Sequence, residues 1–410
     1  MNRHEKLLEL SHLLRKPARK VRVLSAISWP LSVADNFLAS WHRGNPIAPA
    51  PIGDVKRASK LEAEFSSIIG KCDREDPIGR YLADTAGSYR TAVQLLAHTG
   101  TKRFFELSCD LYGSSGGTLR GSELTHREAA DNILLATDEM AQLRQPPDYC
   151  VTAEGVATEM KKEWRGFFEK PMRFVVDENL SAKAAASSMR VRLRKGTCFT
   201  VDDAAQLSAH EVGVHSLTAR NGARQPIVPA LGLGAPRTTA TQEGIATFAE
   251  LVTGTIDLAR LRRLALRVRA IALVEEGADF IELFRSLLDS GEPEREAVFT
   301  AMRIFRGADP AGGAPFTKDV VYLRGLFAVH TFLRKAISER RPELVGALFV
   351  GRLTLGDVMA FESEMGTTVS PPRYLPRWAT RLPSLAAFLS FSALMNSVDL
   401  GRVTLGDDYA

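Results

Sequence analysis

The sequence predicts an α+β fold that is predominantly helical and contains one small antiparallel sheet. Three observations lead to this prediction. Apolar residues recur at three- and four-residue intervals through most of residues 1–170. Two short runs, 172–176 and 189–193, are rich in β-branched or aromatic residues, and the second alternates apolar with basic side chains. The helical pattern resumes after Val201.

The first part of the chain combines a basic segment with several helices. Five cations lie within the eight residues 15–22, a pattern typical of a solvated, partly flexible leader. Apolar periodicity predicts helices over residues 54–69, 77–98, 101–112 and 122–143. Glycine or proline clusters at 113–117 and 145–147 are expected to break them.

We divide the chain into a basic leader over 1–50, a helical region over 51–170 that packs on the core, and a third region over 171–410. In this third region one helix is expected to begin after Asp202 and to end at the pair Asn221–Gly222, and a second to begin near Thr241. An arginine-rich segment follows over 256–288. We interpret its cations as a solvated face, because no stacking aromatic residues lie among them.

Composition and charge argue against several classes of protein. Lysine and arginine number 53 against 48 aspartate and glutamate residues, and the resulting formal net charge of +5 does not indicate a nucleic-acid partner. The N-terminus carries early charges and lacks the apolar core of a secretion signal. The uncharged stretch 382–398 contains a proline and several polar residues, which suits a buried helix better than a membrane span.

The cysteines point to a reducing environment. The chain contains 4 of them, and no two form a C-x-x-C pair. We interpret all of them as ordinary buried thiols. The sequence therefore predicts a soluble, cytoplasmic protein with neither a nucleic-acid nor a membrane partner.

The most informative stretch is His210-Glu-Val-Gly-Val-His215, inside an expected helix. Zinc hydrolases commonly use H-E-x-x-H, in which the two histidines bind zinc and the glutamate acts as base. Here the histidines are five residues apart, and a regular helix would leave their rings about 140° apart instead of about 40°. A π-bulge or an early break in the helix would absorb the extra residue, and Gly213 lowers the cost of such a distortion.

A catalytic zinc site needs a third protein ligand beside the two histidines. Glu243 is the candidate, because it lies at the start of the next expected helix, and the loop between allows the two helices to face each other. Glu250 lies seven residues further, on nearly the same helix face, and is the rival donor. Alternatively, Glu243 is a first-turn carboxylate that stabilises its own helix.

These motifs resemble those of the microtubule-associated tyrosine carboxypeptidases and of their bacterial relatives, the flavohaemoglobin-expression-modulating proteins with a Q-E-G-L-A motif. The family's H-E-x-x-x-H corresponds to residues 210–215. Its second motif corresponds to Gln242-Glu-Gly-Ile-Ala246, with isoleucine in place of leucine. Weaker similarity extends from Ile27 to Gly325, about three-quarters of the chain.

The resemblance implies a zincin-like metallopeptidase core in residues 171–410. It implies one Zn²⁺ per chain, held by His210, His215 and Glu243, with Glu211 as the catalytic base. It also implies that the substrate is a peptide or protein tail from which a C-terminal aromatic residue, Tyr or Phe, is removed. The family's eukaryotic substrate is the tail of α-tubulin, which we do not carry over to this chain.

A carboxypeptidase also needs a cation for the terminal carboxylate of its substrate, and a bidentate arginine suits this role best. The candidates after the zinc motif are Arg220, Arg237, Arg303, Arg306, Lys318 and Arg324. We favour Arg306, Lys318 and Arg324, which lie in and after a glycine-rich loop. Tyr322, one helical turn after Lys318, is a candidate hydrogen-bond donor to the tetrahedral oxyanion.

Two other functions compete with the peptidase. A non-enzymatic, zinc-stabilised scaffold or regulator would fill all four zinc positions with protein ligands and would have no use for Glu211 as a base. Residues 113–117 match the G-x-S-x-G pattern of serine hydrolases around Ser115. That pattern requires a preceding strand, and a helical run precedes it here.

Overall fold

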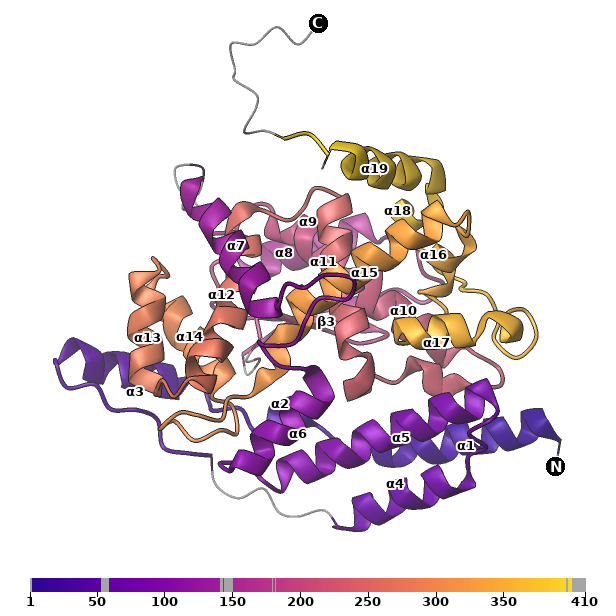
Figure 1. Ribbon diagram of the computed structural model, residues 1–410, viewed down its shortest axis with the longest axis horizontal. Helices are drawn as coiled ribbons and strands as arrows, with labels where there is room; N and C mark the ends of the chain where they lie inside the picture. Colours follow the sequence, from indigo (N-terminus) through magenta and orange to yellow (C-terminus); the bar gives the residue numbers. More distant parts are fainter. Residues whose placement is uncertain are drawn as a thin grey trace, which may run out of the picture.

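The computed structural model describes residues 2–52, 59–140, 143, 150–178, 180, 182–395 and 397–399. The fold is mostly helical with one small sheet, as predicted (Figure 1). The helices before the sheet are α1 (Arg3–Ala18), α2 (Val23–Ala26), α3 (Ser32–His42), α4 (Ser59–Lys71), α5 (Pro77–Leu96), α6 (Lys102–Tyr112), α7 (His126–Glu139) and α8 (Ala153–Glu163). Helices α4 to α7 match the four predicted stretches. The expected start of α4 at Asp54 and the turn at 145–147 lie outside the described residues.

The segment expected as a flexible leader contains the packed helix α1. A capping box between Asn2 and Glu5 starts this helix. Leu7, Leu10 and Leu14 recur at helical spacing and are buried where α1 packs against α4 and α5 (Figure 1). One hydrophobic cluster runs from these leucines to residues after the sheet. The boundaries at 50 and 170 stay predictions.

The small sheet has three strands, β1 (Arg173–Asp177), β2 (Ala184–Ala186) and β3 (Arg190–Arg194), in the order β1-β3-β2. Strands β1 and β3 pair in parallel, and β2 pairs antiparallel to β3. The prediction of an antiparallel sheet was therefore wrong for the two runs on which it was based. The reason is β2, which lies in the connection between them: the chain reverses from β1 to β2 and again from β2 to β3, so β3 runs in the direction of β1.

One continuous helical rod follows the sheet, composed of α9 (Asp203–Leu207), the π-helix η2 (Ser208–Ser216) and α10 (Leu217–Ala223). Asp202 stands at its N-cap position, as predicted, but the Asp202 side chain makes no capping hydrogen bond. The predicted end at Asn221–Gly222 was wrong, because both residues lie inside α10. The Asn221 amide donates instead to the carbonyls of Phe349 and Tyr374, each at 2.8 Å. The Asn221 side chain therefore forms tertiary hydrogen bonds and does not cap the helix.

The arginine-rich segment forms two helices, α12 (Leu258–Glu275) and α13 (Phe280–Asp289), separated near Gly277, whose φ of 112° does not fit a helix.

None of the helices in the described ranges is both long and apolar enough to cross a membrane. The remaining helices are η3 (Pro229–Gly232), η4 (Pro236–Thr238), α11 (Thr239–Val252), α14 (Glu294–Ile304), η5 (Thr317–Asp319), α15 (Val320–Ser338), α16 (Glu343–Ala347), α17 (Leu355–Ala360), η6 (Glu362–Glu364), α18 (Arg377–Thr380) and α19 (Leu382–Met395).

Helices α11 and α15 cross at the centre of the molecule through two glycines (Figure 1). A Cβ atom on Gly325 would lie 2.1 Å from the carbonyl oxygen of Ala240, and one on Gly244 would lie 2.3 Å from that of Gly325. Only glycine permits backbones to approach so closely. The crossing places the start of α11, with Glu243, beside the start of α15.

Two of the cysteines do not fit the expectation of buried thiols. Cys150 and Cys198 are exposed and form a disulfide, with their Cα atoms 4.8 Å apart. The next residue of each, Val151 and Phe199, pairs in an isolated β-bridge, which brings the two segments together. A sequence separation of 48 residues gives no local signal for this pairing. Cys72 and Cys109 are free and half-buried.

The helix crossing predicts the effect of a single methyl group. Gly325→Ala should lower the free energy of unfolding by about 1–3 kcal/mol, because the added Cβ forces α11 and α15 apart. Chemical denaturation measures this change. Gly87→Ala in α5 is the matched control, since its Cβ would meet nothing within 4 Å, and it should be neutral or stabilising by up to about 1 kcal/mol. Equal stability of Gly325→Ala and the unsubstituted protein would contradict the close approach.

Candidate metal centre

The π-helix η2 solves the spacing problem of the two histidines. A π-helix closes its hydrogen bonds between residues five apart, so His210 and His215 lie on one face of η2. Their ring centroids are 4.8 Å apart. Of the two distortions considered from the sequence, the chain uses the π-helix and not an early break.

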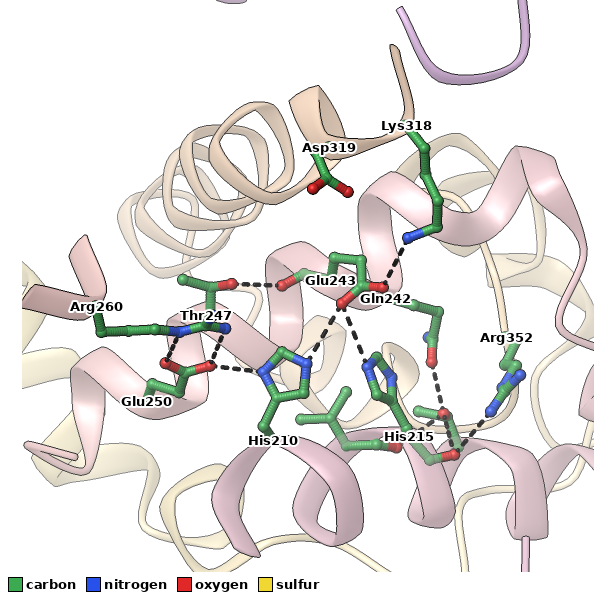
Figure 2. A network of polar contacts seen from close by, with 12 residues as sticks. His210, His215, Gln242, Glu243, Thr247, Glu250, Arg260, Lys318, Asp319 and Arg352 are labelled. Carbon is green, nitrogen blue, oxygen red and sulfur yellow. Dashed lines mark hydrogen bonds and ion pairs between the residues drawn. The ribbon is translucent and has the colours of Figure 1, made fainter. Parts of the chain in front are cut away.

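Glu243, in the first turns of α11, faces both imidazoles (Figure 2). Its Oε2 atom lies 3.3 Å from Nε2 of His210 and 3.4 Å from Nε2 of His215. The donor atoms of these three residues all lie within 4.8 Å of one another. The structure thus brings together the three residues that the sequence marked as metal ligands.

The donor atoms fit a zinc ion. Zinc bonds of 2.0–2.1 Å in a tetrahedral site set the ligand atoms roughly 3.3 Å apart, which matches both distances from Glu243. Glu243 Oε2 is buried, and among the described residues it faces only the two imidazole nitrogens, which lie farther away than the donor of a usual charged hydrogen bond. Because a buried acceptor without a close donor is costly, a bound cation would stabilise this arrangement.

The carboxylates on either side of His210 favour the cationic form of its ring. Burial lowers the pKa of His210, but hydrogen bonds to Glu243 and Glu250 outweigh burial and raise the pKa to about 10. Burial also opposes ionisation of Glu243, but Lys318 and the two histidines hold its pKa well below the ordinary value.

Glu250, the rival donor, lies on the opposite side of His210. Its Oε1 atom is 2.6 Å from His210 Nδ1, whereas Glu243 faces Nε2 of the same ring. Arg260 binds both oxygens of Glu250 at 3.1 Å (Figure 2). Burial raises the pKa of Glu250, but Arg260 and His210 outweigh it and lower the pKa to about 2. Glu250 is thus an ionised carboxylate behind the histidine and not a member of the donor group.

Glu211, the predicted base, follows His210 directly in η2 and is buried. Its carboxylate forms no hydrogen bond within the part of the chain that the structure describes. A carboxylate beside a metal site that is not already engaged is available to accept a proton.

The predicted substrate-binding residues divide into two groups. Lys318 reaches the centre, with Nζ 3.5 Å from Glu243 Oε1 and 5.1 Å from the ring centroid of Tyr322. Arg306 is buried near Tyr322, and burial together with the neighbouring Arg303 lowers its pKa to about 10. Arg324 is not brought to this group, because its guanidinium donates to the carbonyl of Tyr112 at 2.9 Å.

The interpretation of the arginine-rich segment as a solvated face was wrong for three of its cations. The side chains of Arg260, Arg262 and Arg267 are 16%, 6% and 16% exposed. They pair with Glu250, Asp138 and Asp319, respectively. The spacing of seven residues between Arg260 and Arg267 places both on one face of α12. The spacing alone does not identify the buried face, because Arg262 and Arg269 are also seven residues apart, yet Arg262 is buried and Arg269 is exposed.

Asp319 is the meeting point of several guanidinium groups. Arg303 binds both of its oxygens, at 2.6 and 2.8 Å, and Arg267 Nε lies 3.6 Å from Oδ2. No described carboxylate forms an ion pair with Arg306. Asp319 is thus the one carboxylate paired within the described cluster of Arg267, Arg303 and Arg306, so this cluster carries a net positive charge beside the candidate metal centre.

The sequence also gave no signal for Arg352. This residue follows α16, and its Nη2 atom donates to the carbonyl of His215 at 3.1 Å (Figure 2).

Ser115, the nucleophile of the alternative serine-hydrolase hypothesis, lies in the turn after helix α6 and hydrogen-bonds to Glu275. The element before it is a helix and not the strand that the G-x-S-x-G pattern requires.

Comparison with known proteins gives one extensive match. A family model described as microtubule-associated tyrosine carboxypeptidase matches residues 35–397. Among solved structures, a metallocarboxypeptidase 1 of Trypanosoma cruzi aligns over 96% of this chain and 99% of its own, with 13% identity and a TM-score of 0.38. That likeness is too low to support an inference. Among curated protein sequences, none matches significantly.

The Asp319 cluster predicts a buried ion pair that matters for stability. Asp319→Asn should lower the free energy of unfolding by about 3–5 kcal/mol, because it leaves buried guanidiniums unpaired. Burial raises the pKa of Asp319, but Arg303 and Arg267 hold it below the ordinary 3.8. The ionised Asp319 therefore makes its full contribution to the free energy of unfolding above pH 3.8. That contribution is lost as the pH falls through the lowered pKa of the folded protein.

Urea denaturation at neutral and acidic pH measures both effects. Asp131→Asn is the control, because Asp131 forms an exposed pair with Arg269 that is worth about 1 kcal/mol at most. A loss of stability no larger than that of Asp131→Asn would contradict the role given to Asp319.

Proposed function

Because the chain belongs to the microtubule-associated tyrosine carboxypeptidase family, we propose that it is a zinc-dependent carboxypeptidase. Its substrate is a peptide or protein tail, and the terminal residue that it prefers is aromatic, Tyr or Phe. One observation carries the proposal: Glu243 Oε2 lies between two imidazole nitrogens, at 3.3 and 3.4 Å. Glu211, the residue after His210, is buried and its carboxylate has no hydrogen-bond partner among the described residues. The family match also confirms the resemblance inferred from the two motifs.

In this proposal His210, His215 and Glu243 hold one Zn²⁺. The ion would polarise the scissile carbonyl and lower the pKa of water at the site. Glu211 accepts a proton from the attacking water as the water oxygen bonds to the carbonyl carbon. Glu211 then delivers that proton to the leaving amine when the peptide bond breaks. The products are a free amino acid and a tail shorter by one residue.

The cations around Tyr322 would bind the C-terminal carboxylate of the substrate. Arg306 and Lys318 are the substrate-binding residues expected from the sequence. We add Arg267 to this carboxylate site, because Asp319 must neutralise both Arg267 and Arg303 and so leaves positive charge over. An anion supplied by the substrate would neutralise the excess positive charge of this cluster. Tyr322 donates a hydrogen bond to the developing oxyanion in this scheme. Arg324 stays a candidate from sequence alone.

A purely structural zinc site fits the residues less well. Such a site binds four protein ligands, whereas three donor residues gather here within the described ranges. Glu250 does not supply the fourth, because it faces the other nitrogen of His210. A site with three protein ligands leaves a position for water or substrate, as catalysis requires.

The cytoplasmic location expected from the sequence is part of the proposal. The exposed disulfide between Cys150 and Cys198 weighs against it, because disulfides persist mainly in oxidising compartments. Thiol labelling of the protein in intact cells tests whether Cys150 and Cys198 are reduced, as a cytoplasmic location predicts.

Substitutions at the centre separate metal binding from catalysis. His210→Ala should lose zinc, as measured by elemental analysis of the purified protein. Glu211→Gln should retain zinc near one per chain but lose at least about 100-fold in turnover of peptides that end in Tyr or Phe, because the base is removed. Full activity in Glu211→Gln would refute the mechanism, and full metallation of His210→Ala would refute the ligand set.

The carboxylate site predicts a preference for a free C-terminus. Arg306→Gln should lower kcat/KM for a free-acid peptide by about 10- to 100-fold, the loss expected for one charged hydrogen bond. The same substitution should change hydrolysis of the C-terminally amidated peptide much less. Arg269→Gln, at an exposed position on α12, is the control and should leave both rates unchanged. Equal losses with acid and amide substrates would place Arg306 outside the carboxylate site.

A further inference from the structure

The ring of His210 is held at both of its nitrogen atoms. Nε2 faces Glu243, and Nδ1 lies 2.6 Å from Glu250 Oε1 (Figure 2). In known metal sites, a carboxylate on the second nitrogen of a histidine ligand fixes the orientation of the ring. Glu250 occupies that position in this chain.

Glu250 is itself fully enclosed, with 0% of its side chain exposed. A carboxylate removed from water needs a partner charge and hydrogen bonds to stay ionised and in place. Arg260 supplies both, with Nε 3.1 Å from Oε2 and Nη2 3.1 Å from Oε1. This bidentate geometry fixes the plane of the carboxylate as well as its position.

We propose that Arg260 is a positioning residue of the metal centre, which acts through Glu250 to keep Nε2 of His210 directed at Glu243. The inference rests on the proposed metal site. No hydrogen bond or ion pair links Arg260 to His210, His215 or Glu243 among the described residues. Arg260 also interacts electrostatically with Glu243. Its hydrogen bonds reach the His210 ring only through Glu250, which is the route by which Arg260 would orient that ring.

The competing explanation is that Arg260 only attaches α12 to α11. Arg262 provides the comparison, because it is also buried on α12 but pairs with Asp138 and donates to the carbonyl of Ser290. Both arginines join α12 to a neighbouring segment, but only the pair made by Arg260 continues to a histidine of the candidate centre. A structural role therefore predicts similar consequences for the two, and a positioning role does not.

The first test measures the Kd for Zn²⁺ by competition with a chelator, using the full chain. Arg260→Gln and Glu250→Gln should each weaken zinc binding by about 10- to 100-fold, the range found for lost partners of metal-bound histidines. Arg260→Lys should fall between these variants and the unsubstituted protein, because it keeps the charge but not the two-pronged geometry. It also provides a measurement if the glutamine variants fold poorly.

Arg262→Gln is the control, and it should lower the melting temperature while its Kd for Zn²⁺ stays within about twofold of the unsubstituted protein. If Arg260→Gln and Arg260→Lys melt at lower temperature but bind zinc as tightly as the unsubstituted protein, Arg260 only attaches the helix and the proposal is overturned. If the unsubstituted protein itself binds no zinc, the metal centre of the proposed function fails instead. The two failures are thus distinguishable.

A double-mutant cycle tests the route of the effect. If Arg260 acts through Glu250, the variant Arg260→Gln/Glu250→Gln should bind Zn²⁺ as tightly as Glu250→Gln alone. Losses that multiply would show an independent action of Arg260 and would overturn the inference. The absorption spectrum of the Co²⁺-substituted protein gives a second readout, because Arg260→Lys should shift the d–d bands if the His210 ring changes orientation. Arg262→Gln should leave the bands unchanged.

Discussion

Five residues separate His210 from His215, yet both imidazoles must reach the same carboxylate oxygen of Glu243. A regular α-helix cannot meet this requirement, because it would turn the second ring about 140° away from the first. The π-helix from Ser208 to Ser216 meets it, and neighbouring segments support that geometry. Arg352 binds the carbonyl of His215, and Ser216 donates to the carbonyl of Ser187 just before β3. The small sheet therefore contributes to the site without supplying a metal-binding residue.

The position of Glu243 depends on a second constraint, the close crossing of α11 and α15. Gly244 follows Glu243 directly and contacts the backbone of Gly325. Because neither glycine carries a Cβ atom, the start of α11 can approach α15 and the preceding turn η5. Lys318 then lies within 3.5 Å of Glu243. The same crossing that builds the core thus sets the distance between the candidate ligand and the candidate substrate-binding cation.

Helix α12 contributes charge to two parts of the site. Arg260 stabilises Glu250 behind His210, and Arg267 joins Arg303 at Asp319. At Glu250 the charge of Arg260 and that of the carboxylate are matched. At Asp319 cations outnumber carboxylates, and this imbalance suits a site that binds an anionic substrate group. The modest net charge of +5 for the whole chain hides this local separation.

The sequence alone determined the helical class, the family and the residues that could bind a metal, because periodicity, cap residues and the two motifs are local patterns. It also required a distortion between His210 and His215, since the spacing conflicts with an α-helix. It did not determine the strand directions, the disulfide of Cys150, the buried face of α12 or the role of Glu250 as partner of His210. Those features depend on which segments meet in space. A buried arginine and a solvated one look alike in a sequence, and only the packed neighbours decide between them.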